Sequence, residues 1–249
     1  EYENTMNDLF GTNLNLAAML PEDGRAEGFD TVGEALSLSM VQLERYLLAA
    51  NATLDSAIAK KPEKPQSETK LHTYGNSRDG KEFIGKAWHQ NPDGAVVFYR
   101  RNGYPSGMLR EASVRQTGRH RVRVTAYAHQ SDKPVTFSIG ANTYKRGAEI
   151  PTFGWYALPP GKPTTVEVDT WIEANYMIQI EPEGISDRNN EIREKGIANY
   201  KGPGLAILGI EIEGPIVDEY PSRGHRLIFD GLERREIVPG NPRERERPW

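Results

Sequence analysis

The chain has 249 residues, a formal net charge of −4 at pH 7 and 37% hydrophobic residues, which is enough to bury a core in one large domain or in two smaller ones. It contains no cysteine, and this excludes disulfides, thiolate metal sites and cysteine nucleophiles. No apolar run approaches the eighteen or so residues that a membrane helix needs, and no basic stripe suggests nucleic acid, so we expect neither a membrane span nor a nucleic-acid partner.

The first sixty residues have helical periodicity. Apolar residues recur at helical spacing over residues 2–10, and Gly11 follows as a natural helix end. A second helix is predicted to begin after Ser39, whose hydroxyl suits an N-cap.

Ten acidic residues against three basic ones make this predicted domain, residues 1–60, acidic. Because two short helices bury little alone, we expect the domain to dock on another one. The sequence starts at Glu1 inside a predicted helix, without methionine, so we also expect a preceding segment to be missing.

Residues 61–80 are charged and contain proline, which predicts a linker, and the periodicity then changes from 3.6 to 2. Residues 120–130 alternate strictly, with Val122 and Val124 on one face. Further strands are predicted at 82–88, 95–100, 134–140, 164–171, 175–182 and 205–215. Many short strands with one-sided alternation are typical of an antiparallel β-sandwich or jelly roll, here over residues 81–215.

One polar insertion, residues 184–202, interrupts the strand rhythm and is predicted to contain a short helix. Residues 216–249 combine charge and proline, and we predict an extended C-terminal arm or linker there. The predicted fold class is therefore mainly β, an antiparallel β-sandwich or jelly roll with a small N-terminal α-helical domain.

No strong catalytic signature is present. The nucleophile elbow, the phosphate-binding loop and the dinucleotide-binding glycine motif are all missing, and the five histidines are not spaced as zinc ligands. Glu211 and Glu213 share a strand face, about 6.5–7 Å apart, which is a spacing that glycosidases can use. A Glu-x-Glu on a solvated strand is commonplace, however, so the hypothesis of an independent enzyme depends on this pair alone.

Carboxylates at predicted strand ends also suggest a calcium site, because Ca²⁺ binds several carboxylate and carbonyl oxygens. The candidate ligands are Glu82, Glu211, Glu213 and Asp218. Residues 187–191 form a weaker alternative loop, and the other interpretation is a set of exposed acids without an ion.

Aromatic residues near predicted turns are candidates for sugar binding. Trp155 and Tyr156 are consecutive on an extended segment, so their side chains should lie on opposite faces. Parity places Trp171 and Tyr127 on outward faces, and Tyr104 falls in a Gly-Tyr-Pro-Ser-Gly loop. Exposed rings can stack on sugar faces while neighbouring polar groups bind hydroxyls. The alternative is that these rings pack against the helical segment or against further domains.

The N-terminal stretch resembles a known family. The Glu-Tyr-x-Asn-Thr start, the Asp-Leu-Phe-Gly helix end, the Gly-Phe-Asp loop and the following Leu-Ser…Glu-x-Tyr-Leu helix resemble the helical planctomycete secreted domain, over residues 1–58. That family implies a larger exported bacterial protein, periplasmic or at the cell surface, with a c-type haem domain and partner domains. No C-x-x-C-H motif occurs here, so any haem would belong to another part of such a protein and this region is not expected to be catalytic by itself.

A second resemblance covers residues 81–215. The strands around 117–140, the Leu-Pro-Pro-Gly turn with its following strand, and the closing strand at 205–215 resemble the jelly rolls of carbohydrate-binding modules related to families 6 and 35. Those modules imply sugar binding through aromatics and a structural calcium. We therefore predict a non-catalytic region that binds polysaccharide by aromatic stacking; the alternative is a scaffold that positions redox or hydrolytic domains without binding sugar.

Overall fold

The computed structural model describes the whole chain except residues 13, 21–38, 101–105, 186–188 and 233–249. The chain divides into two compact units, a helical unit made of Glu1–Lys64 together with the chain from Asp218 onward, and a β-sandwich unit, Pro65–Val217. Within the described part of the chain, none of the helices combines the length and the apolar character that a bilayer crossing requires.

The helical unit contains α1 (Tyr2–Phe10), a 3-10 turn η1 (Ala17–Met19), α2 (Met40–Ala57) and α5 (Arg223–Phe229). The predicted helix ends are confirmed. Gly11 adopts a left-handed conformation, with φ of 65°, after α1. Ser39 caps α2 through a capping box in which the backbone N–H of Gln42 donates to the Ser39 hydroxyl at 3.1 Å.

Helix α5 lies inside the stretch that composition predicts to be an extended arm. Ser222 caps this helix and also donates to the Ala57 carbonyl at 2.6 Å. The buried His225 accepts from the Ala59 amide through Nδ1 at 3.2 Å. A Cβ at Gly224 would lie 2.7 Å from the Phe10 carbonyl oxygen, so only glycine allows this close approach. Polar capping contacts hold α5 in place, and apolar periodicity does not reveal them.

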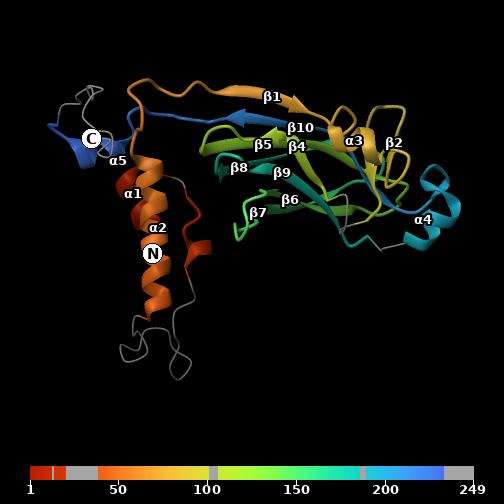
Figure 1. The fold of residues 1–249 in the computed structure, drawn as a ribbon, viewed down its shortest axis with the longest axis horizontal. Coiled ribbons are helices and arrows are strands. Elements are labelled where there is room, and N and C mark those ends of the chain that lie inside the picture. The colour runs from red at the N-terminus through yellow and green to blue at the C-terminus, as the bar shows by residue number, and fades with distance from the viewer. Residues whose placement is uncertain (13, 21–38, 101–105, 186–188, 233–249) are drawn as a thin grey trace. The chain divides into compact units, whose positions relative to one another are not determined.

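The described part of the β-sandwich unit contains ten strands. They are β1 (Glu68–His72), β2 (Trp88–Gln90), β3 (Val96–Phe98), β4 (Met108–Ser113), β5 (Gly118–His129), β6 (Val135–Asn142), β7 (Thr152–Leu158), β8 (Thr164–Ile172), β9 (Met177–Glu183) and β10 (Gly204–Gly214). The six-stranded sheet has the order β2-β3-β10-β5-β8 with β1 also paired to β10, and the four-stranded sheet has the order β4-β9-β6-β7. All these pairings are antiparallel. Figure 1 shows the two sheets as stacked layers, so the predicted mainly β sandwich is confirmed.

The core lies between the sheets and follows the predicted alternation. Val122 and Val124 on β5 are fully buried, as are Phe137 and Ile139 on β6. A second, smaller cluster lies on the outer face of the six-stranded sheet, beneath the insertion that contains α4 (Asn189–Lys195) and η3 (Ile197–Asn199). The short helix expected in this insertion is therefore present.

The stretch 61–80, which composition predicts to be a linker, contributes β1 to the six-stranded sheet. β1 runs along β10 from the pair Glu68–Gly214 to the pair His72–Ile210. Four of its five side chains are exposed, so it lacks the apolar alternation that would predict a strand. Backbone pairing to β10 places it in the sheet.

The strand predicted at 82–88 is wrong except at its last residue, Trp88, where β2 begins. Helix α3 (Arg78–Phe83) occupies this position, with Ser77 accepting from the Gly80 amide at 2.8 Å as its N-cap. Phe83 enters the core from the helix. Ser77 at the N-cap and the buried Asp79 in the first turn favour a helix here, and they outweigh the apolar residues that suggest a strand.

Candidate functional site

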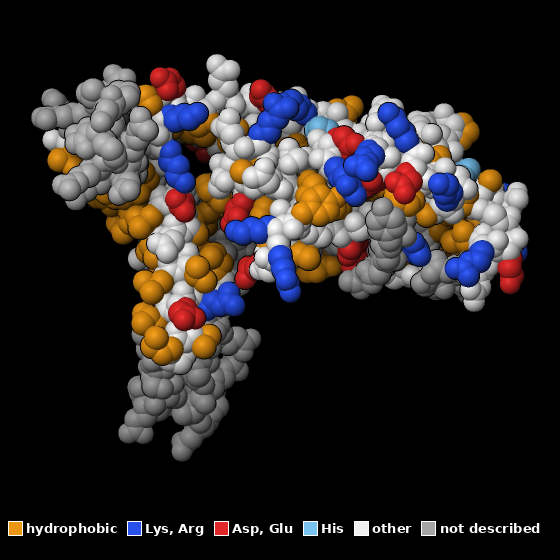
Figure 2. Space-filling view, viewed as in Figure 1, with side chains coloured by type: hydrophobic (Ala, Val, Ile, Leu, Met, Phe, Trp, Pro, Cys, Tyr) orange, Lys and Arg blue, Asp and Glu red, His pale blue; other side chains and the backbone are white. Residues whose placement is uncertain are grey.

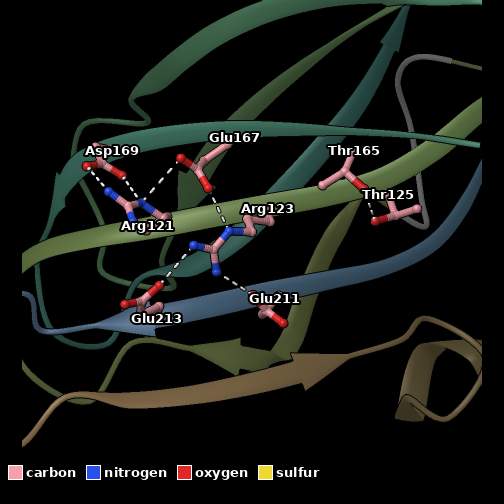
Figure 3. Close-up of polar contacts among 8 residues, drawn as sticks. All are labelled: Arg121, Arg123, Thr125, Thr165, Glu167, Asp169, Glu211 and Glu213. Atoms are coloured by element: carbon pink, nitrogen blue, oxygen red, sulfur yellow. Dashed lines mark hydrogen bonds and ion pairs between the residues drawn. The ribbon is translucent and has the colours of Figure 1, made fainter.

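The outer face of the six-stranded sheet carries a ladder of arginines and carboxylates (Figure 3). Arg123 on β5 contacts Glu167 Oε2 at 2.6 Å, Glu211 Oε1 at 2.5 Å and Glu213 Oε2 at 3.1 Å. Arg121, two residues earlier, forms a two-pronged pair with Asp169 at 2.7 and 2.9 Å. These residues lie directly opposite one another on β8, β5 and β10, which is the spacing at which cross-strand charges interact.

The ladder is satisfied by its own members. Hydrogen bonds from Arg123 to Glu211 and Glu167 raise the pKa of Arg123, and the hydrogen bond from Arg121 lowers the pKa of Asp169. Glu211 and Glu213 both face the same guanidinium, so the arrangement is an ion network and does not resemble an acid paired with a nucleophile.

We expect Arg123→Gln to lower the melting temperature of the β-sandwich unit by about 2–4 °C, because it leaves three neighbouring carboxylates without their shared cation. Differential scanning calorimetry would measure this change. Added salt should reduce the difference from the wild type by screening the exposed carboxylates. Arg146→Gln, at an exposed position in the β6–β7 loop, is the matched control. An equal effect of both substitutions would show that the ladder contributes nothing specific.

The predicted metal ligands do not form one site. Glu82 lies on α3, Glu211 and Glu213 contact Arg123, and Asp218 belongs to the helical unit. Among the residues that the structure describes, no group of three or more His, Cys, Asp and Glu side chains could hold a metal ion. The alternative loop at 187–191 lies partly outside the described residues.

Tyr127 points outward from β5, as parity predicts, but it is not exposed. Only 7% of Tyr127 is accessible, because Ile197 and Tyr200 of the insertion cover it. Its hydroxyl donates to Asp93 at 2.8 Å and accepts from the Asn91 amide at 2.8 Å. The ring belongs to a small core with satisfied hydrogen bonds and presents no face to a ligand.

The consecutive aromatics on β7 do lie on opposite faces. Tyr156 packs inward, with its ring centroid 5.7 Å from that of Phe137, whereas Trp155 is 66% exposed on the outer face of the four-stranded sheet. Trp171 is half-buried opposite Arg119, on the outer face of the other sheet. The two tryptophans therefore belong to different surfaces, and Tyr104 lies outside the described residues.

Polar side chains lie beside Trp155 on the same face of the sheet; Asn142 and Glu181 are half-buried there, and Ser138 and Gln179 are buried. Across the sheet, Trp155 is next to Ser138, and Ser138 is next to Glu181. The Gln179 amide donates to Glu181 Oε1 at 2.7 Å, and the Asn142 amide donates to Gln179 Oε1 at 2.9 Å. We call the surface made by these five residues the Trp155 face. Its amide and carboxylate groups are held in fixed orientations by one another.

A second exposed aromatic belongs to the loop that follows β6. Tyr144 is 64% exposed, and the Arg110 guanidinium lies 5.3 Å from its ring centroid. Sequence reasoning missed Tyr144, and it also missed Asn142, Gln179 and Glu181. The alternation of β9 could have found two of these, because Ile178 and Ile180 in the core place Gln179 and Glu181 on the outer face.

A family model matches the N-terminal part of the chain. Residues 1–59 match the family described as PSD3, a protein of unknown function (DUF1587). No curated protein sequence matches the chain.

Several solved structures resemble the chain over about three fifths of its length. The C-terminal family 6 carbohydrate-binding module of LamC, a marine laminarinase from Zobellia galactanivorans, is 14% identical to this chain. The match covers 59% of this chain and 100% of that chain, with a TM-score of 0.36. A family 6 module of Cellvibrio mixtus lichenase 5A in complex with cellotriose is also 14% identical, with 59% and 98% covered and a TM-score of 0.32. The Eiger TNF of S. frugiperda is 11% identical, with 61% and 88% covered and a TM-score of 0.30.

Proposed function

We propose that the β-sandwich unit binds a neutral polysaccharide across the Trp155 face. The observation that carries the proposal is the exposed Trp155 on the same sheet face as the half-buried Asn142 and Glu181, which the buried Gln179 amide joins by hydrogen bonds. A rigid indole offers a flat surface for the C–H groups of a pyranose ring, and the fixed polar groups beside it suit the ring's hydroxyls.

Charge favours a neutral polymer over an acidic one. The outer side of β9 carries Glu181 and also Glu183, which follows it at the same parity. Two carboxylates beside a bound polysaccharide would repel uronate or sulfate groups of that polysaccharide. We also propose that the protein is exported, since polysaccharides of this kind lie outside the cell.

The proposal is tested by affinity electrophoresis of the whole chain in gels that contain single polysaccharides. We expect retardation by at least one neutral plant or algal glucan, xylan or mannan, and none by polygalacturonate or alginate. Migration that is unchanged in every gel, or slowed only by the acidic polymers, would contradict it.

A structural role in assembly is the second candidate, and one observation favours it. The helical unit exposes large apolar side chains along α2, among them Met40, Val41, Leu47 and Leu48, which are 50–71% accessible. Figure 2 shows hydrophobic side chains gathered over this helix. Such a surface is typical of a contact with another protein domain. In that case the sandwich would position partner domains, and every polysaccharide gel would leave the chain's migration unchanged.

A further inference from the structure

A polar groove lies at the edge of the β-sandwich unit, between β1 on one side and the end of β4 with the β4–β5 connection on the other. Its volume is about 210 Å³. Glu68, Lys70 and His72, which alternate along β1, line one side, and Glu111, Ser113 and Arg115 line the other. This size is below the roughly 300–1,000 Å³ of sites for drug-sized molecules. The groove therefore suits a small and strongly polar ligand.

The floor of the groove contains a hydrogen-bond acceptor that the fold holds in place. His120 is 3% exposed, and its Nδ1 lies 2.9 Å from the Gly118 carbonyl oxygen. Because a carbonyl can only accept, Nδ1 carries the proton and Nε2 is left as an acceptor. The Nε2 side of the His120 ring lies against Gly214. A Cβ added to Gly214 would be 2.2 Å from Cδ2 of His120 and 2.9 Å from its Nε2. Gly214 also lines the groove, so Nε2 is beside the space that a ligand would fill.

The walls add exposed donors and acceptors. Glu111 Oε1 accepts from the Arg78 amide at 2.8 Å, which orients this carboxylate. Lys70 pairs with Glu68 on the same strand face. Burial lowers the pKa of both His72 and His120, which favours the neutral form of each imidazole.

The balance of charge decides which small polar ligand fits. Lys70 and Arg115 are matched by Glu68 and Glu111, so the groove has no excess charge to attract an anion or a cation. Donors and acceptors alternate around it instead. This is the pattern that binds neighbouring hydroxyl groups, each of which both donates and accepts.

We propose that this groove is a binding site for a single neutral sugar ring, separate from the Trp155 face. The site holds the ring by hydrogen bonds to its hydroxyls, without aromatic stacking, and it does not depend on the proposed polysaccharide binding. A ligand of about a dozen non-hydrogen atoms held in this way has a dissociation constant of about 1 mM.

The test is an amide ¹H–¹⁵N NMR titration of the whole chain with glucose, galactose, mannose and xylose, and with glucuronate as the anionic probe. We expect at least one neutral sugar to shift the amides of residues 68–72 and 113–116. Ser113→Leu, which fills the groove, should weaken that binding by about tenfold or more. Two control variants should leave the affinity for the sugar unchanged. They are Thr165→Leu, at an exposed position on the edge strand β8 of the six-stranded sheet, and Trp155→Ala.

Each other outcome overturns the proposal. If only glucuronate shifts these amides, the groove is an anion site. Shifts that persist in Ser113→Leu would place the sugar elsewhere, and no shift with any probe would show that the groove binds no sugar. Failure here leaves the electrophoresis result untouched, because the Trp155 face contributes no residue to the groove.

Discussion

Trp155→Ala is expected to weaken polysaccharide binding by about 30-fold or more, which corresponds to the loss of one dominant contact at a binding surface. The indole is the largest exposed apolar group on this face, and the polar residues beside it can bind hydroxyls only when the sugar ring is held against the sheet. Isothermal titration calorimetry with the polymer identified by electrophoresis would measure the change.

Trp171→Ala is the matched control for this experiment. Trp171 is the same residue type on an edge strand of the same unit, but it lies on the outer face of the six-stranded sheet. We expect its replacement to leave the affinity unchanged. Equal losses in both variants would contradict a binding surface on the four-stranded sheet, and an unchanged affinity in Trp155→Ala would show that stacking on this residue does not drive binding.

Much of the fold could be predicted from the sequence because its core strands are long and strictly alternating. β5 is the best example, since Val122 and Val124 face the core while Arg121 and Arg123 face solvent. The helix ends at Gly11 and Ser39 were equally clear, because each follows from a local conformational preference.

The elements that sequence reasoning missed depend on contacts with distant parts of the chain. β1 is almost entirely exposed and pairs with β10, about 140 residues later, through its backbone. α5 is held through Ser222 and His225, which bond to residues near the end of α2. Neither kind of contact leaves a periodic pattern in the local sequence.

The candidate site was predictable only in part, for a related reason. Parity placed Tyr127 on an outward face and put Trp155 and Tyr156 on opposite faces without telling which of the two is exposed, and these orientations are correct. Exposure is a different property, because an insertion about 70 residues after Tyr127 covers that ring, whereas Trp155 keeps most of its surface accessible. Parity along one strand tells which face a side chain is on, but it cannot tell what else packs on that face.

Phe137→Ala should have the largest effect on stability of any change described here, a loss of about 3–5 kcal/mol. Phe137 is fully buried at the centre of the four-stranded sheet and contacts the ring of Tyr156 on the neighbouring strand. Removing its ring leaves a cavity between the sheets that the surrounding strands can fill only in part. The free energy of unfolding of a folded domain is only about 5–15 kcal/mol, so the variant loses a large share of it.

Urea denaturation followed by near-ultraviolet circular dichroism would measure this loss in the whole chain. Trp155→Ala is the control, because it removes an aromatic ring of similar size from the adjacent strand but on the exposed side of the same sheet. We expect it to change the free energy of unfolding by about 0.5 kcal/mol or less. If both variants lost comparable stability, Trp155 would be part of a packed layer and could not serve as a free platform. A large loss for Phe137→Ala alone would separate the residue that holds the sheet together from the residue that faces a ligand.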